Sequence, residues 1–475
     1  MTTSKMEEIS LEPTYLFYDI ETTGLNKSFD QVLQFAAIRT DCNLKEMARY
    51  ELNVRLNNDV VPSPSALITH QISIMTMYEG ISELDAMQKI HRWLNQPGTI
   101  SLGYNTLGFD DEFLRFSFYR NLLSPYTHQY AAGCGRMDLY PMLIMFYLFK
   151  PSGLHWPEKE GRVSLKLEEL NKANQLASGP SHNAMVDVEA TLALARLLFK
   201  QGEQWHYLQG YFNKRIDAER MQGLYQDNVL MIDVKLGYQA SYQCPVLFLG
   251  HHQHYKNQLL WLRLDHVNFA TLSPTEIVEK MYVIHKKLGE PHFVLPLAPR
   301  FLHHLSQDRL SLAKTNTEWL HHHPDTLQAI ADYSLHYQYP VYPNTDIDAS
   351  LYIQGFWSNR DEKICQTFHT LEPIKKADLT HQIDNAQLRA IAMRLLGRHY
   401  PDVLTSAQTE AFSAYLATIF SSQAEGAPID FKGTKRLTLG AALAEAISLK
   451  NNSNLTQQTT ALLDEYVSHI SRCAG

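Results

Sequence analysis

Tyr15-Leu16-Phe17-Tyr18-Asp19-Ile20-Glu21-Thr22-Thr23-Gly24 is the stretch that decides the fold. Its aromatic and apolar run predicts a buried β-strand. Successive side chains on a strand point to opposite faces, so Asp19 and Glu21 emerge on the same side. Two such carboxylates repel each other unless a cation neutralises them, and their hard oxygen atoms suit magnesium or manganese. The stretch therefore predicts half of a divalent-metal site, with an acidic strand end that turns at Gly24 as the simpler alternative.

Length and composition favour a soluble enzyme with several domains. The chain has 475 residues, enough for several cores, and a net charge of −8. Because nucleic-acid binding depends on neutralising phosphates, positive charge would have to gather locally, with help from divalent cations. Five scattered cysteines fit a reduced cytoplasm. Residues 1–12 have no signal pattern, and the longest apolar run, residues 140–149, is too short to span a bilayer, so we expect a cytoplasmic protein without a membrane span.

Two later junctions add further acids to the first pair. A strand over residues 99–104 runs into a helix that begins at Asp110, and a helix over residues 184–198 carries Asp187 one turn inside it, with His182 in the preceding loop. Each feature alone has an ordinary explanation, since acids favour the first turn of a helix and a histidine there is usually a cap or a surface residue. Their combination with Asp19 and Glu21 favours one shared site.

These residues resemble a known family. Asp19-x-Glu21, Asn105-x3-Phe109-Asp110 and His182-x-Ala184-x2-Asp187 resemble the DEDD exonuclease superfamily, in its His-containing branch. The likeness to bacterial exonuclease I continues through further segments, at residues 35–41, 102–105, 109–112, 119–121, 156–158, 170–174, 348–352 and 355–356. The resemblance therefore covers most of the chain.

The resemblance implies an α/β fold with three domains around a groove for single-stranded DNA. We expect an RNase H-like nuclease domain over residues 1–202, an SH3-like β domain over 203–350 and a helical C-terminal domain over 351–475. The pattern itself predicts two strands that follow the first, over residues 31–40 and 50–56, in antiparallel order. Further predictions are a helix at 82–94, strands at 229–234, 245–249 and 259–264, helices at 275–287 and 310–320, an extended linker at 337–348, and helices after residue 377.

The resemblance also implies a chemistry. It matches Asp19, Glu21, Asp110 and Asp187 to acids that hold two Mg²⁺ ions, for which Mn²⁺ can substitute, and His182 to the general base. Two ions can hold the attacking and leaving oxygens of a displacement, and a histidine accepts protons near neutral pH. The expected reaction is 3′-to-5′ removal of nucleoside 5′-monophosphates from single-stranded DNA, in repair and recombination. We expect a monomer that also docks single-stranded-DNA-binding protein.

Substrate contacts are predicted with open alternatives. The residues in question are Glu21, Thr22, Asn105, Phe109, Arg115 and Lys166. Arg115 and Lys166 could contact phosphates or be solvated surface charges. Asp111 and Glu112 fit helix-start acids better than metal ligands. Tyr207, Tyr211 and Tyr242 could stack bases or fill a core, and the histidines at 251–254 and 321–323 are expected on the surface.

Two other functions stay open. An RNA-trimming 3′ exonuclease would use the same acids, although the large second and third domains argue against it. A nuclease fold that only binds single-stranded nucleic acid would not need Asp19, Glu21, Asp110, His182 and Asp187 together.

Overall fold

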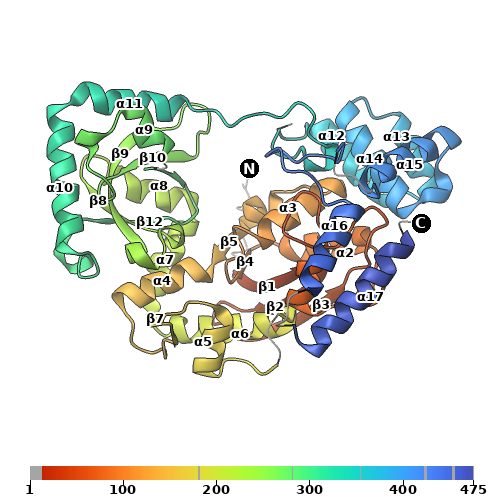
Figure 1. Cartoon of the computed structure of the whole chain (residues 1–475), viewed down its shortest axis with the longest axis horizontal. Coiled ribbons are helices and arrows are strands. Elements are labelled where there is room, and N and C mark those ends of the chain that lie inside the picture. The colour runs from red at the N-terminus through yellow and green to blue at the C-terminus, as the bar shows by residue number, and fades with distance from the viewer. Residues whose placement is uncertain are drawn as a thin grey trace, which may run out of the picture. The chain divides into compact units, whose positions relative to one another are not determined.

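A five-stranded mixed sheet carries the stretch around Asp19 on its central strand (Figure 1). In the order β3-β2-β1-β4-β5, its strands are β1 (Thr14–Thr22), β2 (Val32–Thr40), β3 (Glu46–Asn53), β4 (Thr99–Gly103) and β5 (Gly135–Asp138). β1 runs antiparallel to β2 and parallel to β4, and β2 runs antiparallel to β3. The predicted antiparallel start of the sheet is confirmed.

The computed structural model describes residues 13–179, 182–280, 282–353, 355–421, 425–451 and 455–473. These residues form two units. The first unit contains residues up to 136, residues 175–193 and residues from 340 onward, and the second contains residues 137–174 and 194–339. The N-terminal segment 1–12, where the sequence predicts no signal pattern, lies outside the described residues.

Two helices cover one face of the first sheet. α2 (Glu83–Leu94) and α3 (Asp110–Arg120) bury apolar side chains against Leu16, Tyr18 and Ile20 of β1. The spacing of two along a strand explains why Asp19 and Glu21 are absent from this core, since they lie on the opposite face. The alternation read from the sequence is therefore confirmed.

C-terminal helices complete the first unit. They are α12 (Asn359–Thr370), α13 (Pro373–His381), α14 (Ala386–His399), α15 (Ser406–Ile419), α16 (Leu439–Lys450) and α17 (Gln457–Cys473). Leu388 and Ile391 of α14 share a core with Phe116 of α3. A second core joins α16 and α17 to Leu67 of α1 (Pro64–His70). The helical end of the chain thus packs directly on the nuclease part of the same unit.

Buried charges reinforce that packing. Arg398 of α14, 3% exposed in its side chain, donates from its Nη2 atom to Asp59 at 2.7 Å and also contacts Asp348. Arg394 donates to Asp348 at 2.8 Å. The hydroxyl of Tyr415 donates to Asp59 at 2.8 Å. Arginine pairs well with buried carboxylates because its planar fork presents several donors.

A second five-stranded sheet, antiparallel throughout, forms the centre of the second unit. In the order β11-β10-β9-β8-β12, its strands are β8 (Val229–Ile232), β9 (Gln243–His251), β10 (Gln258–Arg263), β11 (Val283–Lys287) and β12 (Phe293–Pro296). The strands predicted near residues 230, 247 and 261 are confirmed. The likeness to an SH3 domain stays a prediction.

The second unit also contains helices and one short hairpin, which precede, interrupt or follow the strands of this sheet in the sequence. They are α4 (Leu139–Phe149), β6 (Glu158–Lys159), β7 (Arg162–Val163), α5 (Leu167–Asn174), α7 (Gly202–Gln209), α8 (Lys214–Gln222), α9 (Pro274–Glu279), α10 (Gln307–His322) and α11 (Pro324–His336). α6 (Ala184–Phe199) begins in the first unit and ends in the second. Among the described residues, no helix has both the length and the apolar character that a membrane span requires.

Two predictions for the second unit are corrected. The helix expected over residues 275–287 ends at Glu279, and residues 283–287 form β11 instead. The ammonium group of Lys286 in that strand is fully buried against Asp217 at 2.7 Å, a long-range contact that helical periodicity does not reveal. His252, expected on the surface, is buried. Tyr211 and Tyr242 are buried as well, which favours their alternative as core residues.

Candidate active site

Asp19 and Glu21 lie near the C-terminal end of β1, on the face opposite the one that packs against α2 and α3. Burial raises the pKa of Asp19 well above its usual value, and the charges of Asp110 and Asp187 raise it further. Burial and the same kind of repulsion, from Asp19 and Asp187, raise the pKa of Glu21 to about 9. A carboxyl group that is buried among other carboxyls without a cation favours its neutral form. The four predicted acids therefore share one electrostatic environment.

Asp110 is the first residue of α3 and is 5% exposed. The parallel pairing of β1 with β4 ends at Phe17 and Leu102, and beyond it the backbone N–H of Ile20 donates to Oδ1 of Asp110 at 3.2 Å. A side chain at the start of α3 thus replaces the missing strand partner. This hydrogen bond fixes Asp110 beside the residues that flank Ile20, which are Asp19 and Glu21.

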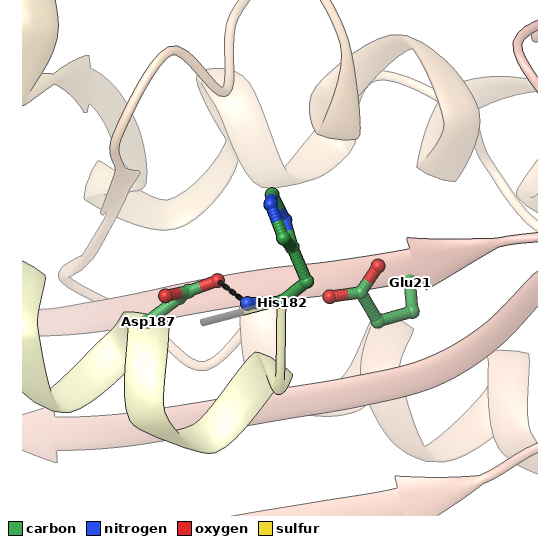
Figure 2. A group of neighbouring side chains, drawn as sticks. All are labelled: Glu21, His182 and Asp187. Carbon is green, nitrogen blue, oxygen red and sulfur yellow. Dashed lines mark hydrogen bonds between the residues drawn. The ribbon is translucent and has the colours of Figure 1, made fainter. Parts of the chain in front are cut away.

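His182 and Asp187 come from the loop before α6 and from the first turn of that helix. The backbone N–H of His182 donates to Oδ2 of Asp187 at 3.2 Å, and Figure 2 shows His182 between the carboxylates of Asp187 and Glu21. His182 has a positive φ of 61° and is exposed. The loop therefore presents the imidazole to solvent, beside the half-buried carboxylate of Asp187 and the buried carboxylate of Glu21.

The donor set of this site suits a divalent cation. Glu21, His182 and Asp187 each offer one ligand atom, and these atoms all lie within 4.8 Å of one another. Asp19 and Asp110 add carboxylates to the same environment. Hard carboxylate oxygens are the ligands that Mg²⁺ and Mn²⁺ prefer, and a bound cation would remove the repulsion that raises the pKa values. The residues present therefore fit the predicted metal.

The neighbouring acid Asp111 is occupied elsewhere. It is 1% exposed and pairs with Arg115 at 2.8 Å, with Arg136 at 2.5 Å and with Nε2 of His128 at 2.9 Å. Burial would raise its pKa, but the two arginines outweigh burial and hold the pKa well below its usual range. Arg115 is 5% exposed and also pairs with Glu112 at 2.5 Å. Arg115, predicted to contact phosphate, is thus engaged in an internal ion cluster.

The other residues predicted to contact substrate differ in their burial and in the unit to which they belong. Thr22 is buried, and its hydroxyl donates to the carbonyl of Gly24 at 2.8 Å. Asn105 is exposed in a left-handed conformation with a φ of 64°. Phe109 packs against Phe113, with 4.8 Å between the ring centroids. Lys166 belongs to the second unit, where it is exposed and directly precedes α5.

His70 is a residue near the site that the sequence analysis missed. It ends α1, is 7% exposed, and its Nδ1 accepts from the backbone N–H of Ile72 at 3.0 Å. Burial lowers its pKa to about 4, with a further contribution from the charge of His182. The only sequence feature that marks it is a histidine at the end of an apolar helix, which is too common to indicate a site.

Comparison with known proteins identifies the family. A family profile described as "Exonuclease" matches residues 16–195, the range that contains all five residues of the site, and one described as "Exonuclease I C-terminal domain" matches residues 345–470. Exodeoxyribonuclease I of Escherichia coli K12 is 27% identical over 448 residues, which cover 88% of this chain and 92% of that protein. The chain belongs to the exonuclease I family.

Other members of the exonuclease I family support this assignment. Exodeoxyribonuclease I of Buchnera aphidicola from Acyrthosiphon pisum is 40% identical over 192 residues, covering 40% of this chain and 46% of that protein. The zinc-bound form of E. coli exonuclease I in complex with single-stranded DNA has the same fold. It covers 98% of this chain and all of its own, with a TM-score of 0.84 and 23% identity.

Proposed function

We infer that this exonuclease I family member degrades single-stranded DNA from its 3′ end to nucleoside 5′-monophosphates. The observation that carries the proposal is the convergence of Asp19, Glu21, Asp110, Asp187 and His182 within the segment that matches the exonuclease profile. The matched C-terminal exonuclease I domain supports DNA over RNA as substrate. The solved E. coli relative in complex with single-stranded DNA supports the same choice.

We assign the four acids to two Mg²⁺ ions, with Mn²⁺ as a substitute. Asp19, Glu21, Asp110 and Asp187 would hold them, since the raised pKa values of Asp19 and Glu21 reflect a site that gains by binding cations. Bound Mg²⁺ supplies Lewis-acid stabilisation of the negative charge that develops during phosphodiester hydrolysis. The zinc ion in the E. coli relative shows that that protein binds a divalent metal.

His182 is assigned as the general base. Its exposed ring sits on a loop, so it can reach a water molecule and return the proton to solvent. The hydrogen bond from its backbone N–H to Oδ2 of Asp187 holds the loop to the site. Asn105, in the loop before α3, and Phe109, which directly precedes α3, are assigned to the terminal nucleotide.

The cellular role follows from the family alone. We propose that the protein acts as a monomer in the cytoplasm, in DNA repair and recombination, and docks single-stranded-DNA-binding protein. Domain limits near residues 202 and 350 stay part of this proposal. So does the assignment of Lys166 to a phosphate contact.

Product analysis with end-labelled oligonucleotides tests the proposed activity. The purified protein is mixed with 3′-labelled and 5′-labelled single-stranded DNA in Mg²⁺, with EDTA and with the same sequence as RNA in parallel. We expect immediate release of a labelled mononucleotide from the 3′ label, gradual shortening of the 5′-labelled strand, and loss of both in EDTA. Asp19→Asn should abolish cleavage, whereas Glu51→Gln, an exposed acid on β3, should leave it unchanged.

Three outcomes would overturn parts of the proposal. Faster digestion of the RNA strand would make the protein an RNA-trimming exonuclease. Binding of both strands without cleavage by the wild type would leave a nucleic-acid-binding module. Full activity in Asp19→Asn would remove the acids from catalysis.

A further inference from the structure

Residues 59–70, a loop followed by α1, contact the end of the catalytic strand within the first unit. The backbone N–H of Ser63 donates to the carbonyl of Thr23 at 2.7 Å, one residue beyond the end of β1 and two beyond Glu21. The pairing of β1 with β2 is irregular here, because its register shifts between Glu21 and Thr22. The segment therefore adds a hydrogen bond at the point where the sheet itself holds β1 less regularly.

The other end of α1 lies near the site as well. Nδ1 of His70 accepts the backbone N–H of Ile72 at 3.0 Å, so the neutral ring carries its proton on Nε2. Burial is the main influence on the pKa of His70, but the charge of His182 lowers it and the backbone of Thr22 raises it. The ring is therefore close both to the end of β1 and to the loop of the assigned general base.

Glu445 of α16 holds the start of α1. Its Oε1 accepts the backbone N–H of Ser65 at 3.2 Å, the hydroxyl of Ser65 at 2.6 Å and the hydroxyl of Ser63 at 3.3 Å. Ser63 is the N-cap residue of α1, but its own side chain makes no capping hydrogen bond. The first N–H groups of a helix have no partner within the helix. Glu445 thus supplies the missing cap from a position about 380 residues away.

Tyr466 of α17 holds the loop before α1. Its buried hydroxyl donates to the carbonyl of Pro62 at 2.6 Å, and its ring shares a core with Leu67 of α1. Glu445 differs from Tyr466 in being only half-buried. Its carboxylate can therefore be changed without emptying the core beneath α1.

We propose that Glu445 is a positioning residue for the exonuclease reaction, which fixes α1 and thereby the end of β1 that carries Glu21. Its hydrogen bonds go to Ser63 and Ser65, and the backbone of Ser63 passes the constraint on to Thr23. Metal sites and reacting groups must be held within about 0.5 Å of their productive geometry. The inference rests on the proposed function for the reaction that Glu21 serves, whereas its effect on metal binding does not require DNA.

Kinetics and metal binding of the full-length protein test this role. Hydrolysis of a 15-nucleotide oligo(dT) and calorimetric binding of Mn²⁺ are measured for the wild type, Glu445→Ala, Glu445→Gln and the control Glu410→Ala, which changes an exposed acid of α15. Glu445→Ala should lower kcat by about 10-fold, because a 1 Å misplacement can cost up to about 10²-fold. KM should stay the same, and Mn²⁺ should bind more weakly. Glu445→Gln should keep most of kcat, since its amide oxygen can accept the same hydrogen bonds.

Tyr466→Phe is a second, independent variant. It removes the hydroxyl that holds Pro62 and keeps the ring in its core, so kcat and Mn²⁺ affinity should fall while KM stays the same. If Glu445→Ala does not fold, as judged by circular dichroism, the same measurements on Tyr466→Phe decide the question.

The outcomes separate this inference from the proposed function. Wild-type kcat and Mn²⁺ affinity in folded Glu445→Ala would overturn it, as would a raised KM with unchanged kcat, an equal loss in Glu410→Ala, or an equal loss in Glu445→Gln. Failure of the wild type to degrade DNA in Mg²⁺ would instead overturn the proposed function, and the Mn²⁺ affinities would still report on Glu445.

Discussion

Replacing Asp59 by asparagine tests how the C-terminal helices are attached to the nuclease part of the first unit. Asp59 is 1% exposed and accepts hydrogen bonds from Nε of Arg398 at 2.9 Å, from Nη2 of the same residue at 2.7 Å and from Tyr415 at 2.8 Å. The guanidinium of Arg436, 3.7 Å away, is a second cation at this carboxylate. Asp59→Asn keeps the shape of the side chain and removes its charge.

The expected loss in the free energy of unfolding arises because Asp59→Asn leaves two arginines buried beside an uncharged side chain. The side chains of Arg398 and Arg436 are 3% and 5% exposed, so water cannot replace the missing charge. Arg398 retains Asp348 as a partner, but Arg436 has no other carboxylate within ion-pair distance among the described residues. Removing one partner of a buried ion pair costs about 3–5 kcal/mol in the free energy of unfolding. We expect the lower end, because the amide can still accept one hydrogen bond.

Urea unfolding followed by circular dichroism measures this effect. The transition of Asp59→Asn should move to clearly lower urea than that of the wild type, with an unchanged slope. Asp384→Asn is the matched control, since the Asp384 side chain is 76% exposed in its pair with Arg360. An exposed pair of this kind contributes less than about 1 kcal/mol. Equal midpoints for Asp59→Asn and the wild type would refute the reasoning.

Three further predictions concern acid stability and catalysis. Burial raises the pKa of Asp59, but the arginines beside it outweigh burial, so the pKa of this carboxyl is depressed in the folded state. The stability that the charged carboxylate contributes is therefore lost as the pH falls. The difference in urea midpoint between the wild type and Asp59→Asn should shrink below about pH 4. His182→Ala should slow single-turnover cleavage by roughly 10²–10⁴-fold without weakening DNA binding, and an unchanged rate would remove it as base. Gly24→Ala should reduce kcat, because the added Cβ would lie 2.5 Å from Oδ2 of Asp30 and displace the loop. A displacement of this kind lowers kcat by up to about 10²-fold. Gly108→Ala, whose added Cβ would meet open space, is the control.

Local patterns predicted the site because its chemistry is encoded in short segments. The alternation along β1 placed Asp19 and Glu21 on one face, and the helix starts at Asp110 and Ala184 followed from their acids and apolar periodicity. The family resemblance then joined three segments that lie far apart in the sequence. Its residue roles stay predictions, since the structure gives proximity and charge only.

Long-range partners explain what the sequence did not reveal. Residues 283–287 are predicted as part of a helix because they follow the helical pattern that starts at residue 275. Their β-branched Val283 and Ile284 favour a strand, and pairing with β10 and the buried contact of Lys286 with Asp217 make them one. The sequence predicts Arg115 as a phosphate contact, but in the structure its guanidinium forms ion pairs with Asp111 and Glu112. Such juxtapositions depend on tertiary packing, which periodicity does not report.

Metal binding linked to proton release tests the central claim, that these acids form a divalent-metal site. Mn²⁺ is titrated calorimetrically into the wild type, Glu21→Gln and the control Glu51→Gln at pH 7.5, in two buffers of different ionisation enthalpy. Because the pKa of Glu21 is raised to about 9 and that of Asp19 is also raised, binding should release protons, and the apparent enthalpy should depend on the buffer. We predict saturable, buffer-dependent binding that Glu21→Gln weakens and Glu51→Gln leaves intact. No saturable binding by the wild type, or equal binding by Glu21→Gln, would contradict the account.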